Sequence, residues 1–326
     1  MPRYLRWLEC RPAVPTFSAM ASLSHRQGCS FAALLVLFPA MLFARTPQDG
    51  PQITYRTGSS EVRIALFATD QKGRPVDTLV QDDFAVVDSG LVIRQFRSLA
   101  RSNETALDVV ALVDTSESVA PRFRANMQHL LQLVAAESTT PPDALSVVQF
   151  AGMQPTLVCS GDCRSPASEQ KLRVIKAQGA TPLFDALVYT ARLVSQRRSS
   201  GARQVIILFS DGNDTISRAS APEAFQALLS SGAVLYTVNV DSSGAASSGS
   251  LLLQQMSDAT GGRSFSARDG IADVLQAILA DLRAAYVVTY SLPSRQAGFH
   301  SLRILPKHNL NLRFHCRRGY YYEEDH

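Results

Sequence analysis

Residues 107–119 read LDVVALVDTSESV, and this stretch decides the fold. An uninterrupted apolar run, 109–113, leads into a loop that carries Asp114, Ser116 and Ser118. A run of this length without a polar residue predicts a parallel strand that is covered on both faces. Because ligands of open α/β sheets bind outside the carboxyl ends of the strands, this loop is the first candidate for a functional site.

Strands and helices alternate from about residue 106 to residue 290, which is the pattern of a parallel sheet. We therefore expect an α/β domain over 106–290. Further strands are expected at 145–150, 156–158, 204–209 and 234–240. Helices are expected at 121–137, 183–195, 221–229, 251–259 and 271–284, where apolar residues recur at helical spacing.

Two β segments, 45–105 and 291–326, flank this domain. Strands are expected at 62–68, 82–90 and 92–96 on one side, and at 286–290, 301–305 and 310–314 on the other. Each flank has few strands for a stable sheet of its own, and unpaired strand edges favour aggregation. Our hypothesis is that the two flanks pair into one small β domain, with the α/β domain inserted between them.

Residues 1–44 have the layout of a secretory signal peptide. Their apolar core, 31–43, is shorter than the roughly 20 residues that span a bilayer as a helix. Met20 is an alternative start. The alternative to cleavage is a retained membrane anchor, because Leu42 stands where signal peptidase prefers a small residue. We expect an exported protein, periplasmic or extracellular or associated with the envelope, without a stable membrane span after cleavage.

The composition indicates a globular protein that does not bind nucleic acid. Of 326 residues, 46% are hydrophobic and 18% are charged, which is typical of folded domains. The leader carries four arginines and one glutamate, so its removal lowers the net charge from +4 to about +1. A balance so close to neutral gives no basis for nucleic-acid binding.

Five cysteines are present, of which Cys10 and Cys29 lie in the leader. Cys159 and Cys163 form a closely spaced pair, and an oxidising compartment favours a disulfide between them. A zinc site in this loop would need further thiol or imidazole ligands nearby. Cys316 is then the odd thiol, either buried in a strand or available for pairing between molecules.

Oxygen donors recur at two further places in the α/β segment. Thr181 lies in a GATPL run just before an expected helix, and Asp211 lies in SDGND directly after an expected strand. Parallel strands place their carboxyl ends at one edge, so these two residues can join Asp114, Ser116 and Ser118 there. Two carboxylates and three hydroxyls suit a hard dication such as Mg²⁺, which keeps several waters and so leaves a coordination position open.

Each donor also has an ordinary structural role available to it. Ser and Asp after a strand are common helix N-caps, and Asp-Gly is a common turn. The donors nevertheless all occur together, each at the end of a strand or the start of a helix, which favours one shared site. Glu117 is expected to be a solvent-facing spacer in the first loop.

The pattern Asp114-x-Ser116-x-Ser118, followed by Thr181 and Asp211, resembles the metal-ion-dependent adhesion site of von Willebrand factor type A domains. The resemblance covers about 106–290. It implies a doubly wound, mostly parallel sheet with helices on both faces. It also implies direct ligation of Mg²⁺, or of Mn²⁺ or Ca²⁺, by the two serines, with Thr181 added when a partner binds. Both aspartates would act largely through water, and an acidic side chain of a partner protein would fill the open position.

The flanks resemble those of secreted bacterial proteins of the VWFA-related, acidobacterial type. The resemblance rests on the run VRIALFATDQKGRPVDTLVQDDFAVVDSG at 62–90 and on the tail FHCRRGYYY at 314–322. It involves turn and aromatic patterns and no site chemistry.

We expect metal-dependent protein binding or adhesion, through an Asp or Glu carboxylate of an unknown partner, and no enzymatic activity. The alternative is a Mg²⁺-dependent hydrolase or phosphotransferase with Asp114 as nucleophile. Against it, Ser116 stands where a second acid would be needed, and the sequence has no P-loop or GxSxG turn. A scaffold with an incidental site is a third reading, which the complete donor set disfavours. The histidines beyond the leader lie in the first expected helix or in the tail: His129, His300, His308, His315 and His326.

Overall fold

The structure is a computed structural model that describes residues 61–72, 74–101, 106–120, 144–161, 163, 165–197, 202–241 and 247–322. The expected leader and the expected helix at 121–137 lie outside the described residues. The chain divides into two units, Met1–Gln52 and Ile53–His326, and every described residue belongs to the second.

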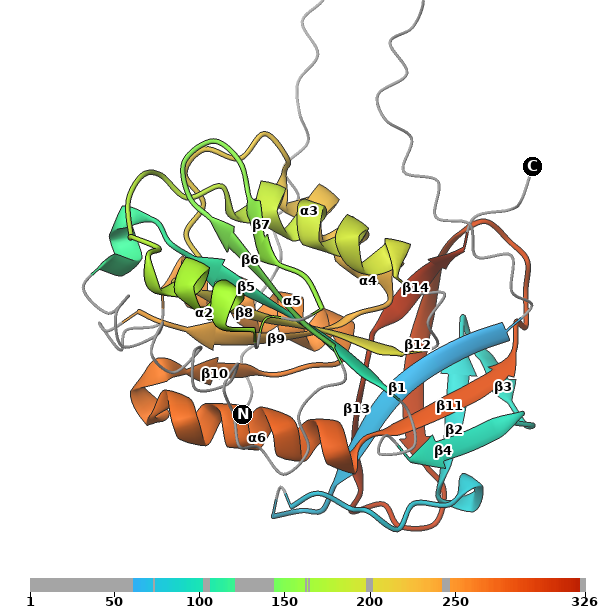
Figure 1. Ribbon diagram of the computed structural model, residues 1–326. Coiled ribbons are helices and arrows are strands. Elements are labelled where there is room, and N and C mark those ends of the chain that lie inside the picture. Colours follow the sequence, from blue (N-terminus) through green and yellow to red (C-terminus); the bar gives the residue numbers. More distant parts are fainter. Residues whose placement is uncertain are drawn as a thin grey trace, which may run out of the picture. The chain divides into compact units, whose positions relative to one another are not determined.

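A six-stranded sheet forms the centre of the α/β domain, with strand order β10-β9-β8-β5-β6-β7 (Figure 1). Neighbouring strands are parallel except β6 and β7, which are antiparallel. The α/β fold class with a mostly parallel sheet is therefore confirmed. The strands are β5 (Leu107–Asp114), β6 (Ala144–Phe150), β7 (Thr156–Cys159), β8 (Arg203–Ser210), β9 (Val234–Asn239) and β10 (Ser264–Ser266).

Helices cover both faces of this sheet, which explains why β5 is apolar without interruption over residues 109–113. Val109, Ala111 and Val113 pack with α6 and α2 on one face, whereas Val110 and Leu112 pack with α3, α4 and α5 on the other. Figure 1 shows α6 on the side of the sheet opposite α3 and α4. The helices are α2 (Pro166–Arg173), α3 (Leu183–Gln196), α4 (Ala221–Ser231), α5 (Ser248–Thr260) and α6 (Ile271–Ala284).

The two β flanks pair with each other in two four-stranded sheets, of orders β13-β1-β11-β4 and β14-β12-β2-β3. Strand β1 of the N-terminal flank pairs with β11 and β13, and β2 pairs with β12. Apolar residues of both sheets, among them Ile64, Phe84, Val288 and Leu302, form one core. The strands are β1 (Glu61–Thr69), β2 (Phe84–Asp88), β3 (Leu91–Ile93), β4 (Ser98–Arg101), β11 (Tyr286–Ser291), β12 (Gly298–Pro306), β13 (Arg313–Cys316) and β14 (Gly319–Tyr322).

Some element boundaries differ from those expected. Strand β11, expected at 286–290 with the C-terminal flank, ends at Ser291, and its neighbours in the sheet are β1 and β4. The strand expected at 310–314 begins only at Arg313, because Asn309 accepts backbone hydrogen bonds from Asn311 and Leu312 and so forms a turn. The strand expected at 92–96 is reduced to β3.

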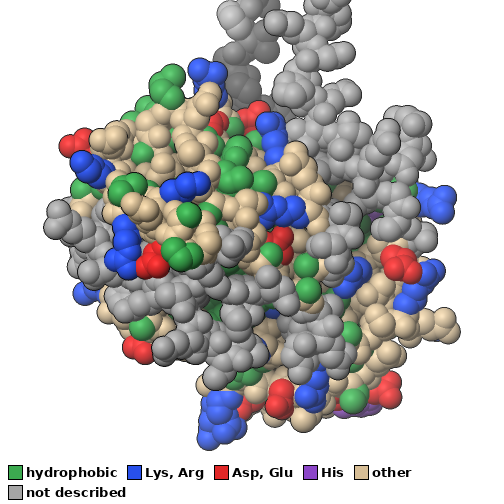
Figure 2. Space-filling view, viewed as in Figure 1, with side chains coloured by type: hydrophobic (Ala, Val, Ile, Leu, Met, Phe, Trp, Pro, Cys, Tyr) green, Lys and Arg blue, Asp and Glu red, His purple; other side chains and the backbone are tan. Residues whose placement is uncertain are grey.

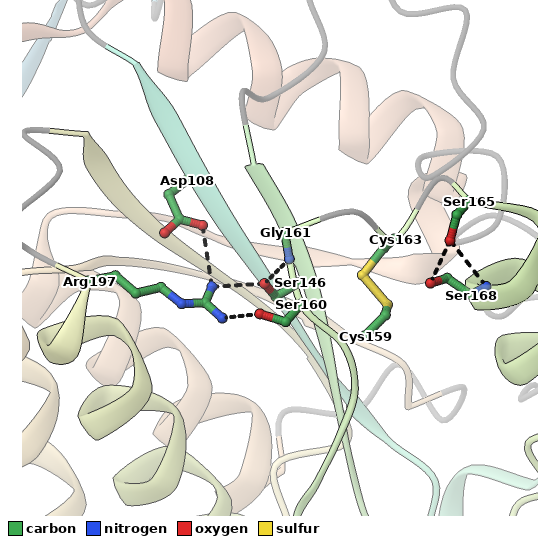
Figure 3. Close-up of a disulfide and its surroundings, with 9 residues drawn as sticks. All are labelled: Asp108, Ser146, Cys159, Ser160, Gly161, Cys163, Ser165, Ser168 and Arg197. Atoms are coloured by element: carbon green, nitrogen blue, oxygen red, sulfur yellow. Dashed lines mark hydrogen bonds and ion pairs between the residues drawn. A yellow bond between two sulfur atoms is a disulfide. The ribbon is translucent and has the colours of Figure 1, made fainter.

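A disulfide between Cys159 and Cys163 lies at the end of the sheet where β5 and β6 begin (Figure 3). Beside it, Arg197 donates hydrogen bonds to Ser146 and Ser160. Its guanidinium also lies 3.6 Å from Asp108 at the start of β5. This end of the sheet is therefore held together by polar contacts as well as by the disulfide.

The third cysteine of the described residues, Cys316 in β13, has a free thiol. Its thiol donates a hydrogen bond to the Arg317 carbonyl, and burial raises the pKa of the thiol to about 11. At neutral pH it is therefore a protonated, weakly nucleophilic group. Among the described residues, no helix is long and apolar enough to cross a membrane.

Candidate metal centre

Asp114 is the last residue of β5, and only 3% of its surface is exposed. One of its carboxylate oxygens accepts a hydrogen bond from the Ser116 amide at 2.9 Å, and the other accepts from the Ser210 hydroxyl at 2.8 Å. Burial raises the pKa of the Asp114 carboxyl, and the nearby charge of Asp211 raises it further, whereas these hydrogen bonds lower it. The carboxylate is thus fixed in orientation and lies near a second acidic side chain.

The loop after Asp114 brings two hydroxyl groups together. The hydroxyl oxygens of Ser116 and Ser118 lie 3.1 Å apart, with Ser116 fully buried and Ser118 exposed. The intervening Glu117 begins a short 3-10 turn (Glu117–Val119) and is exposed, in accord with a spacer. The two hydroxyls therefore lie side by side, that of Ser116 in the interior and that of Ser118 at the surface.

Residues 178–181 form the second arm of the site. The Glu117 amide donates to the Gly179 carbonyl at 2.9 Å, and the Gln178 amide donates to the Thr115 carbonyl at 2.8 Å. These bonds hold the second arm against the loop of Asp114. Thr181 follows at once, with 3% of its surface exposed, two residues before α3 begins.

The third arm follows β8, the strand next to β5 in the sheet. Asp211 is 7% exposed, and its carboxylate accepts a hydrogen bond from the Asn213 amide at 2.9 Å. Gly212 has a φ of +82°, and a Cβ there would meet the Gly249 carbonyl oxygen at 2.3 Å. Only glycine fits this turn, which packs directly against the start of α5.

Backbone and side-chain bonds connect the second and third arms. The Thr215 amide donates to the Thr181 carbonyl at 2.9 Å, and the Thr181 amide donates to the Thr215 hydroxyl at 2.8 Å. Farther along, Asp185 in the first turn of α3 accepts from the amides of Arg218 and Ala219 at 3.1 and 2.9 Å. The loop after Asp211 is thereby anchored to the helix that follows Thr181.

The structure places all five residues expected from the sequence on three arms that are hydrogen-bonded to one another, at the carboxyl edge of the sheet. That these residues bind a metal stays a prediction. Sequence reasoning missed Ser210, Thr215 and Asp185, which support the arms. Their signal in the sequence was weak because Ser before Asp-Gly and Asp in a first helical turn are also common turn and capping residues.

The residues fit a divalent cation in charge and in chemistry. Asp114 and Asp211 are both buried, and within the described part of the chain neither forms an ion pair with Lys, Arg or His. Two neighbouring buried carboxylates without a protein cation are costly unless a positive charge compensates them. In the described residues, no three His, Cys, Asp or Glu side chains lie close enough together to hold a metal ion, so a site here depends on hydroxyl oxygens as well.

A family model described as von Willebrand factor type A domain matches residues 108–280, which is more than half of the chain. The match begins in β5 and ends within α6. It contains all three arms of the candidate metal centre. No curated protein matches the sequence of this chain.

Several solved structures are similar to this chain at low sequence identity. One is an aerotolerance-related membrane protein from Bacteroides fragilis, at 18% identity and a TM-score of 0.43, covering 54% of this chain and 98% of that one. Another is manganese-loaded TRAP of Plasmodium vivax, at 15% identity and a TM-score of 0.42. The match covers 73% of this chain and 99% of that one. A third is proximal thread matrix protein 1 of the mussel byssus, at 18% identity and a TM-score of 0.43. The match covers 60% of this chain and only 50% of that one.

Proposed function

Since the chain belongs to the von Willebrand factor type A domain family, we propose that it binds a partner protein through a divalent cation. Domains of this family are generally metal-dependent adhesion or protein-interaction modules. The observation that carries the proposal is the convergence of two buried carboxylates and three hydroxyls from three mutually hydrogen-bonded arms. The partner would contribute an Asp or Glu carboxylate.

Ser116 and Ser118 would bind the cation through their hydroxyls, and Thr181 would join them when the partner is present. Asp114 and Asp211 would act largely through water. Both Asp114 oxygens already accept a protein hydrogen bond, which supports an indirect role for this carboxylate. The cation, when bound, supplies the positive charge that attracts the partner's carboxylate.

Mg²⁺ is the cation we propose, with Mn²⁺ and Ca²⁺ as alternatives. Mg²⁺ is commonly bound by one or two carboxylates together with several waters, which matches a set of two acids and neutral hydroxyls. Calorimetric titration with each of the three cations tests the assignment and their order. If none of the three cations binds, the proposed function is contradicted.

Type A domains are typically interaction modules without enzymatic activity, and we propose the same here. The alternative of a hydrolase or phosphotransferase would use Asp114 as nucleophile. Asp114 is buried, and its two oxygens accept hydrogen bonds from Ser116 and Ser210. Burial limits the access of a substrate to the carboxylate, and the hydrogen bonds reduce its nucleophilicity, so the geometry favours binding over covalent catalysis.

We also propose that the protein acts outside the cytoplasm, in the periplasm or the extracellular space. The Cys159–Cys163 disulfide supports this location, because such bonds persist mainly in oxidising compartments. Fractionation of cells that express the chain with and without residues 1–44 tests the proposal. Retention of both forms in the cytoplasm would contradict it.

A further inference from the structure

Exposed apolar side chains of the α/β domain gather at the edge that carries the candidate metal centre. In the described part of this domain, the large apolar side chains that are exposed are Met153, Val174, Ile216 and Leu251. Each belongs to a segment that enters or leaves the carboxyl edge of the sheet. Figure 2 shows apolar side chains at the surface of this domain among charged ones. Single exposed apolar residues are normal in folded proteins, but the location of all four at one edge of the sheet needs a physical explanation.

Met153 and Ile216 each follow a residue that is hydrogen-bonded to the Thr181 arm. The amide of Gly152, just before Met153, donates to the Ala180 carbonyl at 2.8 Å. Thr215, just before Ile216, exchanges hydrogen bonds with the backbone of Thr181. Their exposed fractions are 76% for Met153 and 41% for Ile216. Both therefore lie beside the residue that would join the cation when a partner binds.

Val174 and Leu251 lie in segments that contact the other two arms. Val174 is 68% exposed and begins the connection from α2 to Gln178, which is bonded to the loop of Asp114. Leu251 is 53% exposed in the first turn of α5, two residues after Gly249. A Cβ on Gly249 would lie 2.4 Å from the Asp211 carbonyl oxygen, so this turn lies directly against the third arm.

We propose that Met153, Val174, Ile216 and Leu251 form an apolar rim that selects the partner, and that the partner segment carries its metal-binding Asp or Glu between apolar side chains. This inference rests on the proposed function, because the carboxylate is held by the cation. A cation alone would accept any exposed carboxylate. Apolar side chains beside the partner's carboxylate add to the free energy of binding, because apolar surface of both molecules is removed from water. A polyacidic segment cannot supply this contribution.

Two fluorescently labelled, end-blocked heptapeptides test the inference. Each has a central Glu, flanked in one by Leu and Phe and in the other by Ser and Gly. Fluorescence anisotropy measures their dissociation constants for the full chain in Mg²⁺ and in EDTA. Burial of one or two partly exposed side chains predicts about tenfold tighter binding of the apolar peptide in Mg²⁺, and loss of binding of both in EDTA.

Variants of the rim separate this inference from the function on which it rests. Met153→Ser with Ile216→Ser should remove the preference for the apolar peptide while the dissociation constant for Mg²⁺ stays within about twofold. The matched control is Val92→Ser with Leu305→Ser in the small β domain, where both side chains are also exposed. This control should keep the preference.

Four results would contradict the proposed role of the rim and leave the metal-binding proposal standing. Two of them are equal binding of the two peptides, and no Mg²⁺-dependent binding of either peptide although Mg²⁺ itself binds. The other two are tighter binding of a heptaglutamate peptide than of the apolar peptide, and a preference for the apolar peptide that survives in the rim variant. Sedimentation of the chain in Mg²⁺ without peptide gives a further outcome. Self-association that the rim variant abolishes would identify a second copy as the occupant and overturn the assignment to a separate partner. Failure of the wild-type chain to bind Mg²⁺ would overturn both proposals.

Discussion

The Ser210 hydroxyl donates a hydrogen bond of 2.8 Å to Asp114, which joins the last residues of two neighbouring parallel strands. The same oxygen of Ser210 accepts a hydrogen bond from the Gly212 amide at 3.1 Å. Ser210 is fully buried. One hydroxyl group therefore fixes the carboxylate of the first arm and the turn that presents Asp211 in the third.

Replacing Asp114 with Ala should abolish the stabilisation of the protein by Mg²⁺. A ligand at 100 times its dissociation constant stabilises the native state by about 2.7 kcal/mol, which raises the Tm of a domain of this size by about 5 to 10 °C. Thermal unfolding in Mg²⁺ and in EDTA measures the difference for each variant. Asp77→Ala, at an exposed site in the small β domain, is the control. A Tm of the wild type that does not respond to Mg²⁺ would show that the metal assignment is wrong.

Replacing Thr181 with Ala should weaken partner binding more than metal binding. The backbone of Thr181 is held by Thr215, so loss of the side-chain hydroxyl should leave the arm in place. We expect about a tenfold weaker affinity for the Glu-centred peptide, which corresponds to the loss of about 1.4 kcal/mol. Calorimetry with Mg²⁺ alone and anisotropy with the peptide separate the two effects. Equal losses of affinity for Mg²⁺ and for the peptide would count against a role of Thr181 that depends on the partner. The control Thr78→Ala should change neither affinity.

Replacing Ser210 with Ala should lower both the stability and the affinity for Mg²⁺. The substitution leaves the Gly212 amide without its acceptor and one Asp114 oxygen without its donor, at a cost of about 1–3 kcal/mol for an unsatisfied buried group. Ser210→Thr keeps the hydroxyl and should restore most of the Mg²⁺ affinity. Chemical denaturation and calorimetry measure the two quantities. Reduced stability with an unchanged Mg²⁺ affinity would limit Ser210 to a purely structural role.

Replacing Gly212 with Ala should destabilise the protein more than the same change at Gly90. Both glycines have a positive φ, +82° and +85°, so both substitutions cost about 1 kcal/mol in backbone conformation. At Gly212 the new Cβ would also meet the backbone of Gly249, whereas at Gly90 nothing lies within 4 Å. The excess loss of unfolding free energy in chemical denaturation reports this contact. Equal losses at the two positions would mean that α5 can move away from the turn.

The strands that enclose the site were predictable because the middle parts of β5 and β8, residues 109–113 and 205–209, are buried on both faces and consist of apolar residues. The metal-ligand candidates were predictable because hydroxyl and carboxyl groups follow the apolar strands directly or, in the case of Thr181, precede a helix. Helix α2 was missed, since Leu172 is its one buried large apolar residue and gives no helical periodicity. The supporting residues Ser210 and Asp185 act by hydrogen bonds between distant segments, and no local pattern marks such bonds.

Asp88 in β2 connects the two β flanks through side-chain hydrogen bonds. Its carboxylate is fully buried and accepts hydrogen bonds from Tyr290 of β11 at 2.7 Å and from Tyr320 of β14 at 2.8 Å. Burial, and then the hydrogen bond to Asp88, raise the pKa of both tyrosines, so both hydroxyls stay protonated donors at neutral and moderately alkaline pH.

Asp88→Ala should therefore lower the free energy of unfolding by about 2–5 kcal/mol, because the hydroxyls of the buried Tyr290 and the half-buried Tyr320 lose this acceptor. Chemical denaturation measures the loss, with the exposed Asp77→Ala as the control. The Mg²⁺ affinity of the folded Asp88→Ala protein should stay unchanged, since Asp88 lies in the small β domain and the three arms lie in the α/β domain. A stability equal to that of the wild type would show that this cluster does not hold the flanks together.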